Sequence, residues 1–313
     1  MSFSNSRIQK SNVINKFKEE CLLLNSKYES ILDQKNICYE AVIIDKKYKD
    51  IYDLYKKQKR AFWDIDEIDF SKDRDGYISL NENERHFIKY VLALFVYNDE
   101  IVNQTIGRFM EDVSILGSQM FYRFQSVMQD IHSITYSLMI KTLISDSKKI
   151  KELQNSVKTI QVLSKKKEWF EYWIGSEKTP FHVRLLAFAI VEGIFFSASF
   201  CAIYWIKEKK KNIIPGLTQS NELISRDKRL HSTHAVLLFK HLENKPSQEL
   251  VYAIIRKAVK IETEFITESL PCTLIGMSCE KMSEYIQYVA DKLLLQLEYK
   301  KLYNTKNPFQ WID

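Results

Sequence analysis

The amino-acid sequence predicts an all-α fold, a helical bundle, and three observations support that prediction. The 313 residues include only 7 glycines and 5 prolines, and a fold rich in β-turns needs more of both. Apolar residues recur every three or four positions along several long segments, which is the spacing of one face of an α-helix. No internal repeat or low-complexity linker divides the chain, so one helical domain is the simplest arrangement.

The elements follow in order along the chain. Residues 1–40 are polar and mixed, and we interpret them as a peripheral N-terminal arm with one short helix near Asn15–Leu32. Residues 41–313 then form the helical domain. Its first helical pattern is Tyr48–Lys57, and a long helix beginning at Asn83 or Glu84 extends through Phe109. The later helical patterns are Gln119–Ile144, Phe181–Lys207, Ser220–Leu242, Gln248–Ser269 and Lys281–Tyr299, with a break at Glu168–Pro180 and a turn at Ile213–Thr218.

One segment, Leu185–Ile206, is apolar enough to be a membrane span, and Glu192 is its only charge. Its length is close to the ~20 residues that a bilayer crossing needs. A carboxylate in the middle of a span is costly in lipid, however. The other helical patterns could surround this segment, so we expect a helix buried at the centre of the bundle and no membrane association.

Composition excludes two classes of protein. The net charge is +6, but the runs Lys165–Lys167 and Lys209–Lys211 have no interleaved aromatic residues, so we expect no nucleic-acid partner. The five cysteines are odd in number and form no C-x-x-C pair, which favours a reducing compartment over a disulfide framework. The first residues lack a secretory apolar core, and the expected location is cytoplasmic.

The candidate chemistry lies on four of the predicted helices. Two of these helices each supply one acidic residue, Asp99 or Glu192. Each of the other two carries a polar residue that is followed three positions later by a histidine. Proteins with a di-iron carboxylate centre use this frame, with Glu-x-x-His on two helices and one carboxylate on each of the other two. The i, i+3 spacing places both side chains on one helix face. The six positions are Asp99, Gln129, His132, Glu192, Lys228 and His231.

Each of these residues also has an ordinary structural interpretation. A lone His132 or His231 is more often a hydrogen-bonded interior histidine than a metal ligand. Glu192 could be a buried acid with a partner. The surrounding sequence makes the metal-site interpretation more specific.

Five segments in family order resemble the small subunit of class I ribonucleotide reductase. They are AFWDIDEIDFSKD, ERHFIKYVLALFVYNDEIVN, FYRFQSVMQDIHSITYSLMI, AFAIVEGIFFSASF and GLTQSNELISRDKRLH. The resemblance covers about Ile43–Phe309 and implies a ferritin-like helical bundle with additional helices. It is closest in kind to a divergent eukaryotic second small subunit with incomplete metal ligands.

The resemblance implies that four metal-ligand positions are retained and two are changed. Gln129 and Lys228 stand where the family has the glutamates that bridge its two irons. The residual ligand positions are Asp99, His132, Glu192 and His231.

The resemblance also assigns positions for radical chemistry. Tyr136 matches the tyrosine that carries the stable radical, and Trp63 and Asp227 match the path between the first histidine and the surface. Phe196 and Phe200 match the apolar lining near the radical. The alternative is that Tyr136 is only a packed phenol and that Trp63 and Asp227 form a structural network.

Charge argues that the di-iron site is lost. Two carboxylates and a charged Lys228 would leave two ferrous ions with about three uncompensated positive charges. One ammonium ~4 Å from a divalent ion costs roughly 8 kcal/mol at an effective dielectric of ~20. We therefore expect no fully occupied metal cofactor and an ammonium paired with Asp99 or Glu192. A neutral Lys228 would avoid the repulsion without replacing the bridging carboxylate.

The resulting hypothesis is a homologue of the ribonucleotide reductase small subunit that cannot make the radical by itself. It would act in deoxyribonucleotide supply as a structural or assembly partner, in a homo- or heterodimer with another small subunit and together with the large catalytic subunit. The alternative is an active subunit with a mononuclear metal, held by two histidines and a carboxylate. In the family a radical-path tyrosine and a docking tail follow the position of the final NPFQWID, and the sequence leaves open whether this protein has them.

Overall fold

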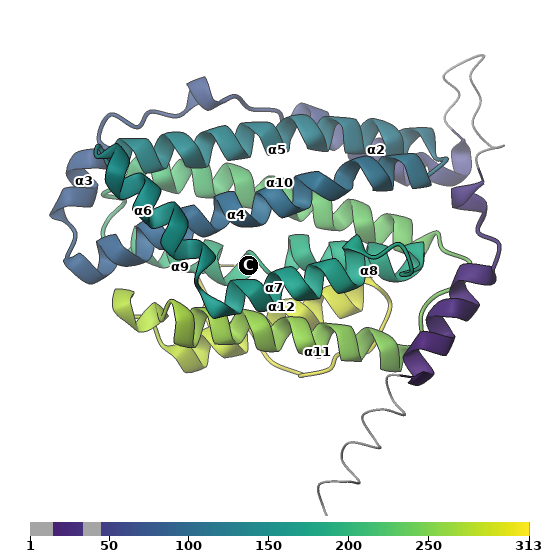
Figure 1. Cartoon of the computed structure of the whole chain (residues 1–313). Helices are drawn as coiled ribbons and strands as arrows, with labels where there is room; N and C mark the ends of the chain where they lie inside the picture. Colours follow the sequence, from purple (N-terminus) through teal and green to yellow (C-terminus); the bar gives the residue numbers. More distant parts are fainter. Residues whose placement is uncertain (1–14, 34–44, 313) are drawn as a thin grey trace, which may run out of the picture.

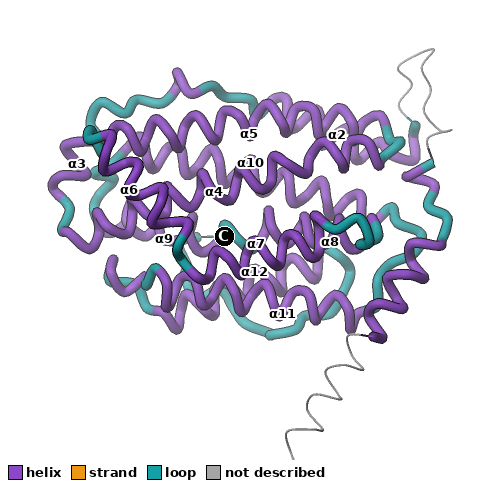
Figure 2. Tube along the Cα trace, viewed as in Figure 1, coloured by secondary structure: helices purple, strands orange, loops and turns teal. Residues whose placement is uncertain are grey.

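Every regular element that the structure describes is a helix, as the sequence predicts (Figure 2). The computed structural model describes residues 15–33 and 45–312. Residues 15–26 form a first helix. The named α-helices are α2 (Lys49–Arg60), α3 (Asp73–Ser79), α4 (Glu82–Asp112), α5 (Leu116–Leu143), α6 (Ser147–Lys158), α7 (Gln161–Phe170), α8 (Phe181–Gly193), α9 (Ser197–Lys209), α10 (Pro215–Lys240), α11 (Gln248–Glu264) and α12 (Cys279–Gln296). Short 3₁₀-helices occupy Ser30–Leu32, Lys46–Tyr48, Ile65–Glu67 and Cys272–Ile275, and π-helical turns occupy Glu171–Gly175 and Phe265–Ser269.

Helix α8 lies at the centre of the bundle. The long helices α4 and α5 pack against each other, and α2 and α10 complete that part of the molecule (Figure 1). Helix α8 contacts α10, α11 and α12. Within Phe181–Lys209, the one described stretch with the length and hydropathy of a membrane span, 94% of the most apolar window is buried in the protein. Protein side chains therefore cover the apolar surface of this stretch.

The apolar stretch is two helices, whereas the sequence predicts one over Phe181–Lys207. Helix α8 ends at Gly193 and α9 begins at Ser197, and residues 194–196 form a turn. The hydroxyl of Ser197 donates a hydrogen bond to the Ile194 carbonyl across this turn, at 2.7 Å. A Cβ on Gly193 would lie only 3.1 Å from the Ser232 hydroxyl, so α10 approaches α8 closely here. Continuous apolar composition hides the interruption in the sequence.

Helix α10 begins inside the predicted turn Ile213–Thr218. Pro215 is its first residue, a position where the missing N–H costs nothing. The next two N–H groups, of Gly216 and Leu217, donate to the Asp73 carboxylate at 2.8 and 2.7 Å. A side chain from α3 therefore caps α10, a partnership that no local pattern predicts.

Three helices were not predicted, and one predicted break is shorter. The sequence patterns miss α3, α6 and α7, which are short. The predicted break Glu168–Pro180 starts too early, because α7 and the following π-helical turn remain helical through Gly175. By contrast, α4 begins close to its predicted start. Asn81 accepts from the Glu84 N–H at 2.9 Å, and the Glu84 carboxylate accepts from the Asn81 N–H at 3.0 Å.

The N-terminal arm packs on the loop between α10 and α11. Its helix ends earlier than the predicted Leu32, at residue 26. The Glu29 carboxylate is buried and accepts from the N–H groups of Glu243 and Asn244 and from His182 Nε2, at 2.8–3.0 Å. The predicted domain boundary between residues 40 and 41 lies outside the described residues.

A glycine substitution tests the contact between α3 and the start of α10. Gly76→Ala should lower the free energy of unfolding by about 1–3 kcal/mol, because the new Cβ would lie 2.0 Å from the Ile213 carbonyl oxygen. Urea denaturation followed by circular dichroism measures this. Gly107→Ala in α4 is the matched control, since no atom lies within 4 Å of its Cβ position, and it should gain up to about 1 kcal/mol of helix propensity. Equal effects of the two substitutions would contradict the packing.

Candidate metal centre

Six side chains from four helices converge in the core. Helices α4, α5, α8 and α10 supply them, and each residue is at most 3% exposed. The two residues on α5 share one helix face, as do the two on α10, because both pairs have i, i+3 spacing. The six are Asp99, Gln129, His132, Glu192, Lys228 and His231.

The ammonium of Lys228 lies among the acidic side chains. Its Nζ is 2.5 Å from Asp99 Oδ1 and 3.3 Å from Glu192 Oε2. It also donates to Gln129 Oε1 at 3.2 Å and lies 4.3 Å from the centre of the Phe196 ring. The lysine therefore pairs with both carboxylates, where the sequence predicts pairing with one or the other.

The ion pair keeps its members charged despite their burial. Burial lowers the pKa of Lys228, but Asp99 and Glu192 outweigh it and raise that pKa above its ordinary 10.5. Burial raises the pKa of Glu192, but Lys228 and His231 outweigh it and lower that pKa below its ordinary 4.5. The raised pKa of Lys228 stabilises the folded protein, and this contribution is lost as the pH rises through the lysine pKa of the folded state. The lowered pKa of Glu192 also stabilises the folded protein, and that contribution is lost as the pH falls through the glutamate pKa of the folded state. Both contributions are complete between about pH 4.5 and 10.5.

Gln129 links the ion pair to the histidine of its own helix. Its Nε2 donates to Glu192 Oε1 at 3.3 Å, and its Oε1 lies 3.2 Å from His132 Nδ1. The orientation of this amide is fixed, because an ammonium can only donate and a carboxylate can only accept. Gln125 Nε2 makes a second, longer contact to Glu192 Oε1 at 3.4 Å. Sequence reasoning missed Gln125, although it lies one helical turn before Gln129.

Several atoms at the centre that could ligate a metal have no hydrogen-bond partner. Asp99 Oδ2 and both ring nitrogens of His231 are buried without one, and His231 Nδ1 is 3.8 Å from Glu192 Oε2. Buried polar atoms without partners are uncommon and call for an explanation. Within residues 15–33 and 45–312, no three His, Cys, Asp or Glu side chains are grouped closely enough to hold a metal ion as they stand.

A second chain of contacts extends from His132 towards the surface. His132 Nε2 is 3.0 Å from Asp227 Oδ2, which also accepts from Trp63 Nε1 at 2.8 Å. Burial raises the pKa of Asp227, but the hydrogen bond and charge of His132 outweigh it and the net pKa is lowered. Burial lowers the pKa of His132 against the opposing effect of Asp227. On the outer side, Arg226 Nη2 lies 3.5 Å from Asp227 Oδ1.

Tyr136 is buried, and its hydroxyl has no hydrogen-bond partner. Burial raises its pKa well above 10. Phe95 stacks on it with ring centres 4.9 Å apart, and Phe95 also contacts Phe196 and Phe200, at 6.1 and 5.0 Å. Sequence reasoning named the last two phenylalanines but missed Phe95, which lies one turn before Asp99 on α4.

One cavity reaches the centre from outside. It measures about 360 Å³, and Glu192 and Lys228 contribute to its inner lining. Its outer lining includes aromatic side chains from α9, α12 and the C-terminal segment, namely Tyr204, Tyr285 and Trp311.

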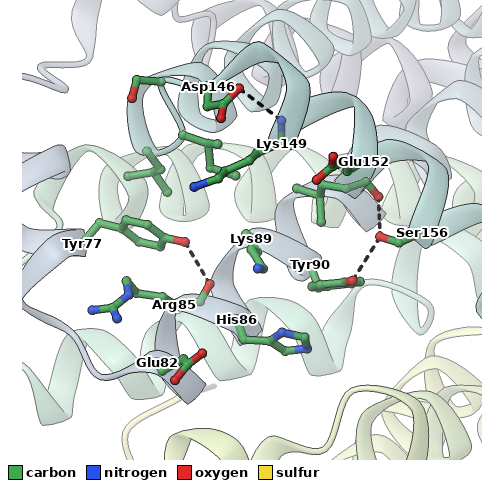
Figure 3. Close-up of a pocket in the computed structure, with 14 residues that line it drawn as sticks. Tyr77, Glu82, Arg85, His86, Lys89, Tyr90, Asp146, Lys149, Glu152 and Ser156 are labelled. Carbon is green, nitrogen blue, oxygen red and sulfur yellow. Dashed lines mark hydrogen bonds between the residues drawn. The ribbon is translucent and has the colours of Figure 1, made fainter.

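A larger cavity of about 620 Å³ lies between α4 and α6, and none of the six central residues lines it (Figure 3). Its charged side chains are close to balance. Its lining includes the basic residues Arg85, Lys89 and Lys149 and the acidic residues Glu82, Asp146 and Glu152.

Comparison with known proteins gives a consistent result. Residues 40–308 match the family described as "Ribonucleotide reductase, small chain". The chain is 48% identical over 273 residues to the ribonucleoside-diphosphate reductase small chain of Spisula solidissima, covering 87% of this chain and 71% of that protein. It is also 48% identical over 273 residues to the human ribonucleoside-diphosphate reductase subunit M2, with 87% and 70% covered. The structure of the ribonucleotide reductase Rnr4 homodimer from Saccharomyces cerevisiae superposes with a TM-score of 0.88 at 30% identity, over 96% of each chain.

Removal of the buried ammonium tests the electrostatics of the centre. Lys228→Met should lower the free energy of unfolding by about 3–5 kcal/mol at pH 7, because it leaves two carboxylates buried without a cation. The loss should shrink at acidic pH, where proton uptake neutralises a carboxylate. Denaturant titrations over a pH series measure both effects.

The matched control is Lys207→Met, which breaks the largely exposed 2.7 Å pair with Glu222. It should change the free energy of unfolding by at most about 1 kcal/mol. A loss in Lys228→Met no larger than in this control would contradict the proposed charge balance.

Proposed function

The chain belongs to the family of ribonucleotide reductase small chains, and we propose that it acts in that enzyme as a subunit whose own di-iron site is lost. The single observation that carries this proposal is the Lys228 ammonium held between Asp99 and Glu192. A cation occupies the space between the two remaining carboxylates, in a chain whose bridging glutamate positions hold Gln129 and Lys228. The cytoplasmic location expected from the sequence is part of this proposal.

The residues present do not fit two ferrous ions. Two carboxylates and one ammonium leave about three positive charges uncompensated, and each divalent ion ~4 Å from the ammonium costs roughly 8 kcal/mol at an effective dielectric of ~20. Lys228 also occupies one of the two carboxylate oxygens of Asp99, because its Nζ lies 2.5 Å from Oδ1. The ammonium thus takes over the charge that a metal would supply. Neither bridging position offers a carboxylate, because residue 129 is a glutamine and residue 228 is a lysine.

The loss of iron would leave Tyr136 without an oxidant. The family's tyrosine is oxidised by chemistry at the iron pair, as the resemblance implies. Tyr136 would then serve as a packed phenol among Phe95 and its neighbours. The contacts of Trp63, Asp227 and His132 would serve as a buried hydrogen-bonded network.

The function that remains is assembly. We infer that the chain pairs with a radical-bearing small subunit, and with the large catalytic subunit, to support the reduction of ribonucleotides to deoxyribonucleotides. The similar yeast protein is described as a homodimer. On α5 an apolar stripe at spacing i, i+7, i+11 faces solvent, with Val127 50%, Ile134 56% and Leu138 40% exposed. We propose that the partner small subunit covers this stripe, because its helical spacing suits packing against another helix.

One observation favours a second candidate, a mononuclear metal site. Asp99 Oδ2 and both nitrogens of His231 could ligate a metal, and none of them has a hydrogen-bond partner. Two histidines with one carboxylate can hold non-haem iron. The ammonium beside them opposes it. Metal analysis of the purified chain separates the two: about one iron per chain favours the mononuclear site, and none favours the assembly role.

Restoring the glutamates tests why the site would be empty. The unchanged protein should bind no iron pair and show no tyrosyl radical by electron paramagnetic resonance after Fe²⁺ and O₂. Gln129→Glu with Lys228→Glu should recover iron binding, because the double change restores four carboxylates and near neutrality. Each single change should recover little, since Gln129→Glu keeps the cation and Lys228→Glu leaves three carboxylates. Non-additive recovery is expected for groups in one network.

Iron stoichiometry per chain is the measurement, for the unchanged protein, both single variants and the double variant. Lys207→Glu with Gln119→Glu serves as a control that makes the same exchange of side chains outside the centre. A normally folded double variant with no more iron than the unchanged protein would refute the assignment of the loss to these two residues. A radical assigned to Tyr136 in the unchanged protein would refute the proposal itself.

The assembly face can be tested separately. Ile134→Asp should weaken small-subunit pairing at least about tenfold, which corresponds to about 1.4 kcal/mol, because a carboxylate would be buried in an apolar interface. Sedimentation velocity of the chain, alone and mixed with a radical-bearing small subunit, measures the effect. Leu295→Asp is the control, since Leu295 is 52% exposed but belongs to α12, whereas the stripe belongs to α5. A chain that stays monomeric alone and in the mixture would count against the assembly role.

A further inference from the structure

Two cysteine thiols are in contact in the segment between α11 and α12. Cys272 begins a short 3₁₀-helix, and Cys279 is the first residue of α12. Their Sγ atoms are 3.6 Å apart. Cys272 is buried, whereas Cys279 is half-buried and so within reach of small solutes. Among the cysteines that the structure describes, no other pair is in hydrogen-bonding contact.

The turn between the two thiols is built to bring them together. Gly276 has φ +71°, a left-handed conformation that glycine adopts without strain, and no atom lies within 4 Å of its Cβ position. The Met277 N–H donates to the Cys272 carbonyl at 3.1 Å, which closes the turn. A disulfide has sulfur atoms about 2.05 Å apart, so the thiols must approach by only about 1.5 Å.

We propose that Cys272 and Cys279 form a site of oxidation by hydroperoxides, closing to an intrachain disulfide. The sulfur of Cys279 attacks the terminal peroxide oxygen, so an S–O bond forms and the O–O bond breaks. The other peroxide oxygen leaves with a proton, as water from hydrogen peroxide or as an alcohol from an alkyl hydroperoxide, and Cys279 becomes a sulfenic acid. The sulfur of Cys272 then attacks the Cys279 sulfur, so an S–S bond forms, the S–O bond breaks and water leaves with the Cys272 proton. The two thiols supply two electrons, and the hydroperoxide is reduced.

The roles of the two sulfurs follow from their exposure. Cys279 meets the oxidant first because it is the accessible thiol. Burial is the main cause that raises the pKa of Cys272 to about 12, so Cys272 is the poorer target for the oxidant. Its Sγ is 3.6 Å from that of Cys279, and this contact places it to attack the oxidised Cys279 sulfur. Cys201 is also buried, and burial raises its pKa well above the ordinary value, so it should not react.

Oxidation of this turn is coupled to the C-terminal segment. Trp205 Nε1 donates to the Ile275 carbonyl within the turn at 3.0 Å. The Trp205 ring also contacts Trp311, with centres 6.0 Å apart. Closing the disulfide would shift Ile275 and therefore the environment of Trp205, against which Trp311 packs.

The test treats the full purified chain with hydrogen peroxide, blocks free thiols with iodoacetamide in denaturant and maps peptides by mass spectrometry. We expect the peptides that contain Cys272 and Cys279 to be joined, lighter by two hydrogens, and restored by a reductant. Cys201 should remain alkylated. Cys279→Ser should abolish the cross-link, and Cys21→Ser, which alters a half-buried cysteine of the arm, should retain it.

Two results on the unchanged chain would overturn the proposal, so it does not depend on any variant folding. One is full alkylation of both Cys272 and Cys279 after peroxide treatment. The control is a parallel sample of free cysteine, which the same peroxide treatment must oxidise completely. The other result is Cys279 oxidised to sulfinic acid while Cys272 stays free. Tryptophan emission should also change on oxidation, and the change should be lost in Trp205→Phe. An unchanged emission spectrum of the fully oxidised chain would overturn the coupling to Trp205.

Discussion

The buried ammonium of Lys228 is the interaction on which the centre of the molecule depends. Asp99 and Glu192 come from two different helices, α4 and α8, and both face the interior, where an uncompensated carboxylate is expensive. The Lys228 side chain, from α10, contacts both carboxylates, so one ammonium links three helices. Gln129 adds the fourth helix, because its amide contacts the ammonium and Glu192 at the same time. The electrostatics that could have organised a metal site are thus satisfied within the chain itself.

The packing around this centre follows from the same constraint. Helix α8 is buried on all sides and offers Glu192 as its acceptor, so the neighbouring helices must supply every partner. A second buried ion pair lies further out, where Lys166 Nζ is 2.6 Å from Glu262 Oε2. Lys166 also lies 4.5 Å from the Phe265 ring centre and 5.2 Å from that of Phe195. Lys166 and Lys228 therefore each lie beside a carboxylate and an aromatic ring, an arrangement that limits the penalty of burying an ammonium.

Trp63, Asp227, His132 and Tyr136 occupy the positions that the family resemblance assigns to radical chemistry, yet each also has a structural task. Asp227 is hydrogen-bonded to both Trp63 and His132, and loss of Asp227 would leave the buried Trp63 Nε1 without its acceptor. Tyr136 fills the space beside Phe95. A subunit that no longer generates a radical would keep these residues for packing and hydrogen bonding alone. Their presence is therefore weaker support for radical chemistry than the identity of residues 129 and 228 is against it.

The sequence by itself determined the helical class, most of the long helices and the six residues at the centre. Spacing along a helix fixes which side chains share a face, so the pairs Gln129 with His132 and Lys228 with His231 could be predicted from residue numbers alone. The charge of Lys228 likewise required an acidic partner. Only the tertiary structure decided what depends on contacts between distant segments: the division of the apolar stretch at residues 194–196, the capping of α10 by Asp73, and the second-layer contacts of Gln125 and Phe95. The contact between Cys272 and Cys279 belongs with these, because it depends on how a turn is held between two helices. Local sequence patterns cannot predict such contacts, because the groups that make them meet only after the helices have packed.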